Sequence, residues 1–261
     1  MIKICVLTLG CPKNIADSEY LISSLPKNKY VFTNIVEEAN IIILNTCGFI
    51  ASSIEESYEY ILALSNLKLK HASKKIIVFG CLVSRLNKYD LIKKFPLVDA
   101  FFGTLSDGDL LSYLNSTFNS TRDLLLTPNY YSYLKISDGC NRRCSFCTIP
   151  NIKGAYEHVY PDSILEEANF LANSGVKELI LIAQETTNYI YNFSSKINTS
   201  NNNLKFVSLL SKLSDIDKLK WIRIMYAHPN SFDLDILELM KDRPNICKYI
   251  DIPLQHIPII Y

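Results

Sequence analysis

The sequence predicts an α/β protein in which an N-terminal open parallel α/β sheet is followed by an incomplete (βα) partial TIM barrel. Short runs made entirely of apolar residues recur along the chain, and such runs are typical of strands buried on both faces of a sheet. Segments with helical periodicity separate them, at roughly the spacing of βαβ units. A second series of strand and helix patterns, four repeats long, indicates the barrel.

The composition supplies enough hydrophobic residues for the cores of two domains, and it disfavours some classes of protein. The chain has 261 residues, of which 48% are hydrophobic, and a net charge of +1. This balance lacks the basic bias of an obligate nucleic-acid-binding protein. We expect a cytoplasmic protein without a membrane partner, because no secretory signal or apolar run of spanning length is present. Eight cysteines in that compartment indicate metal or catalytic roles.

The first domain is expected at residues 1–104 and is followed by a linker at 105–132, where Asp, Gly, Ser, Asn, Thr and Pro are mixed with short apolar patches. Apolar runs predict its strands, and amphipathic patterns predict its helices. The strands are expected at 2–9, 41–44 and 76–79, and the helices at 17–25 and 54–64.

The second domain is expected at 133–261. Its strands are expected at 133–137, 178–183, 221–227 and 249–254, and its helices at 163–173, 206–213 and 234–240. The sequence ends directly after the fourth strand, although parallel strands are normally covered on both faces and exposed edges promote aggregation. We therefore expect the chain to be a fragment of a longer protein or a truncated product.

Three cysteines of the first domain, Cys11, Cys47 and Cys81, each lie just beyond the carboxyl end of a predicted strand and next to a glycine. A parallel sheet brings such positions to one edge, where open α/β folds bind ligands. The sequence predicts a metal site formed by three thiolates. Zinc competes with an iron–sulfur cluster for this triad, and packing of small buried side chains is the alternative without a metal.

Three further cysteines, Cys140, Cys144 and Cys147, form a CxxxCxxC loop after the first barrel strand. Barrel enzymes place their active sites at this end of the strands. Iron–sulfur cubes normally take four cysteine ligands, so a three-cysteine loop leaves one iron free to bind a small molecule. Zinc knuckles and ferredoxin-like loops are the alternatives.

The CxxxCxxC loop, with the aromatic Phe146 before its third cysteine, resembles that of the radical S-adenosylmethionine superfamily. The resemblance implies that Cys140, Cys144 and Cys147 hold a 4Fe-4S cluster whose open iron binds S-adenosylmethionine. The first triad narrows the resemblance to the methylthiotransferases, in which an N-terminal domain holds a second 4Fe-4S cluster involved in sulfur delivery. Cys11, Cys47 and Cys81 match those ligands.

Within that group, the Cys-Pro-Lys-Asn and Thr-Cys-Gly-Phe-Ile segments resemble the RimO branch, whose substrate is an aspartate of a small-subunit ribosomal protein. The matching segments are 9–14, 17–19, 45–50, 80–81, 133–140, 149–150, 184–186 and 251–256. The resemblance implies methylthio insertion at the β-carbon of that aspartate, with a reductase as electron donor and a sulfur donor that the sequence does not identify. A tRNA adenosine methylthiotransferase and a truncated cluster-binding remnant without turnover are the alternatives.

Four residues are expected to contact S-adenosylmethionine: Phe146, Gln184, Glu185 and His256. The alternative for Gln184 and Glu185 is a helix-capping or loop role. The alternative for His256 is that of a hydrogen-bonded structural histidine.

The chain departs from the family pattern where Lys153 and Val159 replace the usual arginines; lysine keeps the charge but not the planar fork. Relatives add two barrel strands and a C-terminal TRAM domain, which the resemblance places outside this chain.

Overall fold

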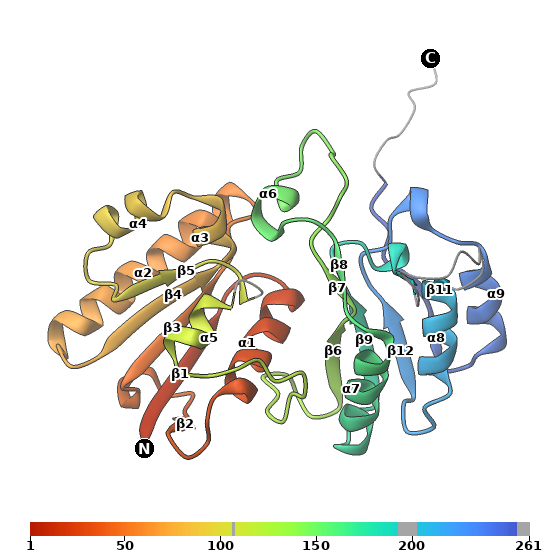
Figure 1. The fold of residues 1–261 in the computed structure, drawn as a ribbon, viewed down its shortest axis with the longest axis horizontal. Helices are drawn as coiled ribbons and strands as arrows, with labels where there is room; N and C mark the ends of the chain where they lie inside the picture. The colour runs from red at the N-terminus through yellow and green to blue at the C-terminus, as the bar shows by residue number, and fades with distance from the viewer. Residues whose placement is uncertain (106–107, 193–202, 255–261) are drawn as a thin grey trace. The chain divides into compact units, whose positions relative to one another are not determined.

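A computed structural model describes residues 1–105, 108–192 and 203–254 (Figure 1). The chain forms two compact units. The first contains residues 1–126 and 142–154, and the second contains 127–141 and the described residues from 155 onward. No helix in the described ranges is both long enough and apolar enough to cross a membrane.

The first unit contains an open sheet of five parallel strands in the order β2-β1-β3-β4-β5. Its strands are β1 (Ile2–Thr8), β2 (Tyr30–Phe32), β3 (Ile41–Thr46), β4 (Lys75–Gly80) and β5 (Ala100–Phe102). Every residue of β3 is buried, as is every residue of β4 except the first. This burial explains the apolar runs and confirms the open parallel sheet that the sequence predicts.

Six helices of the described residues belong to this unit. They are α1 (Pro12–Ser24), α2 (Ala51–Lys70), α3 (Cys81–Arg85), α4 (Lys88–Lys94), α5 (Asp109–Tyr113) and α6 (Ile149–Lys153). Helix α1 begins earlier than expected, with Pro12 at its first position, where a missing N–H costs nothing. Helix α6 comes from far along the chain and packs against α3 (Figure 1).

The second unit is built on four parallel strands in the order β13-β12-β9-β6. They are β6 (Tyr131–Lys135), β9 (Glu178–Ile182), β12 (Trp221–Ile224) and β13 (Ile246–Ile250), accompanied by α7 (Pro161–Asn173), α8 (Phe206–Ser214) and α9 (Asp235–Asp242). Two short antiparallel pairs join β7 (Ser137–Asp138) to β8 (Glu157–His158) and β10 (Ile190–Asn192) to β11 (Asn203–Lys205).

One strand of this unit lies elsewhere than expected. The sequence predicts the fourth strand at 249–254, but β13 spans Ile246–Ile250. As an outer strand of the sheet it is only partly buried, so a lysine and a tyrosine interrupt its apolar pattern. Pro253 cannot donate a backbone hydrogen bond to a ladder, which disfavours a strand continuing through it.

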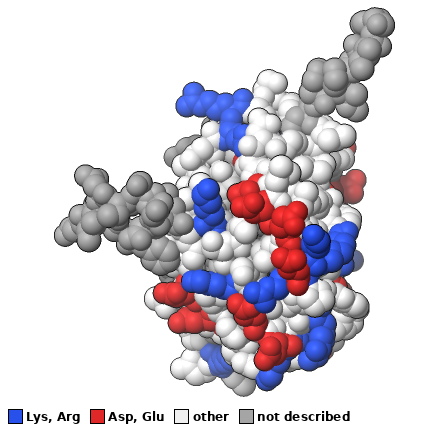
Figure 2. Space-filling view, turned by 90° about the vertical axis from the view of Figure 1, so that its right-hand side faces the viewer, with Lys and Arg blue, Asp and Glu red and all other residues white. Residues whose placement is uncertain are grey.

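The face of the molecule drawn in Figure 2 carries interspersed acidic and basic side chains. On the described residues of that face, no continuous basic patch of the kind that binds a phosphate backbone is present.

Candidate metal centre and cofactor site

The cysteines of the first triad follow three neighbouring strands. Cys11 lies between β1 and α1, Cys47 follows β3 directly, and Cys81 is the first residue of α3, directly after β4. Strand β3 pairs in parallel with both β1 and β4. The three cysteines therefore lie at one edge of the sheet, where open α/β folds bind ligands.

Glycines let the backbones at this edge approach one another. A Cβ atom on Gly10 would lie 2.7 Å from the Cβ atom and 3.0 Å from the sulfur of Cys47. A Cβ atom on Gly48 would lie 2.7 Å from the Cα atom of Leu82. Any side chain at either position would therefore push neighbouring cysteine loops apart.

Two buried asparagines connect the strand ends. The Asn14 amide nitrogen donates to the carbonyl oxygens of Leu9, at 2.8 Å, and Thr46, at 3.2 Å. Its amide oxygen lies 3.9 Å from the sulfur of Cys81, within the contact distance of a weak S–H donor. The Asn45 amide donates to the Asn14 carbonyl at 2.9 Å. A buried hydrogen-bond network whose members all have partners favours a single arrangement of the loops that it joins. The sequence signal for this network is Asn45, a polar residue that ends an apolar run.

A second set of hydrogen bonds fixes the loop after Cys47. The Arg85 guanidinium donates to the carbonyl oxygens of Gly48, at 2.6 Å, and Phe49, at 2.8 Å. The Ser57 hydroxyl donates to the Cys47 carbonyl at 2.8 Å. Sequence reasoning missed both residues, because the contacts of Arg85 and Ser57, 37 and 10 residues apart, belong to no local sequence pattern.

The donor chemistry of the triad fits an iron–sulfur cluster, because soft thiolates are the ligands such clusters take. All three cysteines are free. Burial raises the pKa of the Cys81 thiol to about 12, the positive charge of Lys153 opposes this increase, and the nearby Cys11 and Cys47 add to it. Binding must therefore release a proton from Cys81. Within the described ranges, no three His, Cys, Asp or Glu side chains converge as the ligands of one metal ion.

The CxxxCxxC loop is divided between the units: Cys140 belongs to the second, and Cys144 and Cys147 to the first. The Cys147 amide donates to the Cys144 carbonyl at 3.0 Å, which forms a tight turn. Phe146 lies in this turn and is 72% exposed. Cluster binding by these cysteines and cofactor contact by Phe146 stay predictions.

Polar side chains gather at the carboxyl ends of β6 and β9 in the second unit. The Gln184 amide lies 3.4 Å from a carboxylate oxygen of Asp138, and the same oxygen accepts from the Gly139 amide at 2.9 Å. The Lys135 ammonium pairs with the other oxygen at 3.1 Å. Glu185 is buried beside Gln184. These are the strand ends at which barrels bind their ligands.

One buried hydroxyl in the same unit lacks a hydrogen-bond partner. That of Thr186 is fully buried and has no partner among the described residues. Burial raises the pKa of Tyr156, and its contacts with the Ser137 hydroxyl and the Ile190 backbone oppose this increase. An unsatisfied buried hydroxyl is costly, so Thr186 fits a polar ligand that would complete it. His256 lies outside the described residues.

Comparison with known proteins agrees with both halves of the fold. Residues 3–103 match the model of "Uncharacterized protein family UPF0004", and residues 134–259 match that of the radical SAM superfamily. The ribosomal protein uS12 methylthiotransferase RimO of Flavobacterium johnsoniae is 44% identical over 98% of this chain, and that of Chloroherpeton thalassium is 42% identical over 98%. The chain belongs to the RimO family.

This RimO-family chain spans 58% and 57% of the length of those two relatives. The radical S-adenosylmethionine methyltransferase TsrM of Kitasatospora setae, solved with tryptophan and a SAM analog, has a similar fold. The TM-score is 0.60 at 12% identity, covering 94% of this chain and 58% of that one. At that identity the likeness concerns the fold alone. The family assignment confirms the resemblance that the cysteine motifs indicated.

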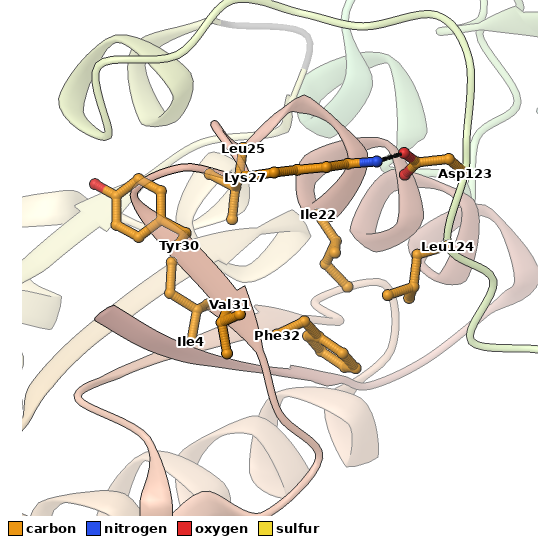
Figure 3. A pocket seen from close by; sticks show the side chains of 9 residues that line it. All are labelled: Ile4, Ile22, Leu25, Lys27, Tyr30, Val31, Phe32, Asp123 and Leu124. Atoms are coloured by element: carbon orange, nitrogen blue, oxygen red, sulfur yellow. Dashed lines mark hydrogen bonds and ion pairs between the residues drawn. The ribbon is translucent and has the colours of Figure 1, made fainter. Parts of the chain in front are cut away.

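An apolar cavity of about 280 Å³ lies elsewhere in the first unit of this RimO-family chain (Figure 3). Ile22, Tyr30 and Phe32 line it, and an ion pair between Lys27 and Asp123 spans part of its rim. The cavity is formed at the edge strand β2 and the carboxyl end of α1, whereas the cysteines follow the carboxyl ends of β1, β3 and β4. It is therefore not part of the candidate metal centre.

Proposed function

We propose that this chain carries the cluster-binding parts of a radical S-adenosylmethionine methylthiotransferase that modifies an aspartate of ribosomal protein uS12. The observation that carries the proposal is a RimO-family sequence in which three thiols follow adjacent parallel strands and a CxxxCxxC loop follows the first barrel strand. The name of those relatives supplies the substrate. A cytoplasmic location and a reductase as electron donor follow from this assignment.

The proposed ligands form two sets. Cys11, Cys47 and Cys81, in a domain at 1–104, would hold the auxiliary 4Fe-4S cluster. Cys140, Cys144 and Cys147, at the start of a domain at 133–261, would hold the radical cluster. When bound, that cluster supplies the electron that cleaves S-adenosylmethionine.

The chain's own residues would position and enclose the cofactor. Gln184 and Glu185 would orient its polar groups through hydrogen bonds, and the unsatisfied hydroxyl of Thr186 would find a partner in it. Phe146 and His256 complete the proposed contacts. Positioning of this kind, together with exclusion of water, is the protein's share in cofactor chemistry.

Anaerobic reconstitution with iron counting tests the cluster assignment. The expected result is two separable cubes, with Cys→Ala changes in one triad removing only the cube of that triad. Zinc in either triad, or a single cube that both sets of changes remove, would overturn it.

Product analysis tests the reaction. The full chain, reconstituted and reduced with dithionite, is expected to form 5′-deoxyadenosine from S-adenosylmethionine. Mass spectrometry of uS12 and of tRNA from a deletion strain then identifies the substrate. Loss of the methylthio group from tRNA with uS12 unchanged would refute the assignment to uS12, and absence of 5′-deoxyadenosine would indicate a remnant without turnover.

A further inference from the structure

A buried ion pair joins helices α1 and α6 in the first unit. The Lys153 ammonium lies 3.1 Å from a carboxylate oxygen of Asp17, and their side chains are only 3% and 4% exposed. Lys153 is the last residue of α6, and Asp17 lies within α1. Removing a lysine and an aspartate from water is expensive, and their mutual attraction offsets the cost only when the geometry is good.

The pair lies close to the first cysteine triad. Asp17 is one helical turn beyond Asn14, whose amide oxygen is 3.9 Å from the Cys81 sulfur. Helix α6 packs against α3, which begins with Cys81. Through Asp17, and through the packing of α6 on α3, the Lys153 ammonium is held near Cys81.

Stability alone is a weak reason for such a pair. Replacing a buried ion pair by apolar residues of similar size is often neutral or stabilising. A cation held in a fixed place near Cys81 has a clearer use, because a bound thiolate is anionic and a positive charge in a poorly solvated site attracts it strongly.

We propose that Lys153, fixed by Asp17, supplies a balancing positive charge for the auxiliary cluster of Cys11, Cys47 and Cys81. The inference rests on the proposed function, because it requires a cluster at that triad. Net charge near a cluster is one of the factors that set its reduction potential. Reduction adds an electron, so a nearby cation stabilises the reduced form and raises the potential.

The test is an EPR-monitored redox titration of the auxiliary cluster. The full chain is reconstituted with alanine in place of Cys140, Cys144 and Cys147, so that only the first triad binds iron. Lys153→Met is expected to shift the midpoint potential to more negative values, and Lys153→Arg, which keeps the charge, is expected to leave it close to that of the parent.

A double variant guards against loss of folding. Lys153→Met alone removes a positive charge that faces a buried aspartate, whereas Lys153→Met combined with Asp17→Asn leaves neither charge. The double variant is compared with Asp17→Asn, which keeps the cation, and its potential is expected to be the more negative of the two. If Lys153 had only a structural role, the midpoint potential of variants with a full complement of iron would not depend on the charge at position 153.

Each outcome is decisive. An unchanged or more positive potential in fully loaded Lys153→Met relative to the parent, or in the fully loaded double variant relative to Asp17→Asn, overturns the inference and leaves the proposed function intact. Failure of the parent to bind a cube at the first triad overturns the proposed function itself.

Discussion

Replacing Gly48 by alanine tests how the cysteine loops are held together. The new Cβ atom would lie 2.7 Å from the Cα atom of Leu82, 2.8 Å from its nitrogen and 2.9 Å from the carbonyl oxygen of Cys81. These neighbours are backbone atoms at the start of α3, so no side chain can rotate away. Ordinary contact begins near 3.4 Å, and the two loops must therefore separate by about 0.7 Å.

The size of the effect follows from opposing contributions. Adding a carbon to a packed interior costs about 1–3 kcal/mol, and fixed backbone neighbours favour the upper limit. Alanine in place of glycine restricts the unfolded chain, which returns about 0.4–1 kcal/mol. The net loss of unfolding free energy is about 2 kcal/mol, or roughly thirtyfold in the unfolding equilibrium.

Urea denaturation of the metal-free chain and iron counting after reconstitution measure the two consequences. We expect Gly48→Ala to lower the denaturation midpoint and to bind less iron at the first triad. Gly108→Ala is the matched control, because a Cβ atom there meets nothing within 4 Å. It should lose only about 1 kcal/mol for its left-handed backbone and bind iron normally. Wild-type stability and full iron binding in Gly48→Ala would refute the reasoning.

Three further predictions concern other groups. Glu19→Gln breaks a fully buried ion pair with Arg122 and should cost about 3–5 kcal/mol in denaturation experiments, most of which Glu19→Gln combined with Arg122→Met should recover. Thr186→Val removes an unsatisfied buried hydroxyl, so stability should hold while binding of S-adenosylmethionine, measured by calorimetry, weakens by about tenfold. Because burial raises the pKa of Cys81 to about 12, the thiol stays protonated at pH 8, and mass spectrometry should find its alkylation roughly a thousandfold slower in the folded metal-free chain than in urea; equal rates would contradict its burial.

Sequence reasoning was strongest where local pattern and burial coincide. The apolar runs of β3 and β4 are central strands buried on both faces, so composition alone identified them. The three-residue edge strands β2 and β5 are too short to produce a pattern. Strand β13 alternates poorly because only part of it is covered.

The surroundings of the candidate site depend on contacts that no local pattern encodes. Three cysteines after three strand ends were visible in the sequence. The support from Arg85 to the loop at Gly48 was not, because it joins residues 37 apart. The ion pair of Lys153 with Asp17 spans 136 residues. Lys153 was noted only as a departure from a family pattern, and its environment shows what that charge contacts.

The buried asparagine network has a consequence for the order of assembly. Asn14 and Cys81 meet across 67 residues, and they meet only once β4 has paired with β3 and β3 with β1. Closing so long a loop is costly in entropy, and contacts of this range form late in folding. The first triad should therefore bind iron only after the sheet has formed. In a nascent chain that has not yet completed β4, the three cysteines are not held close together and do not form a binding site.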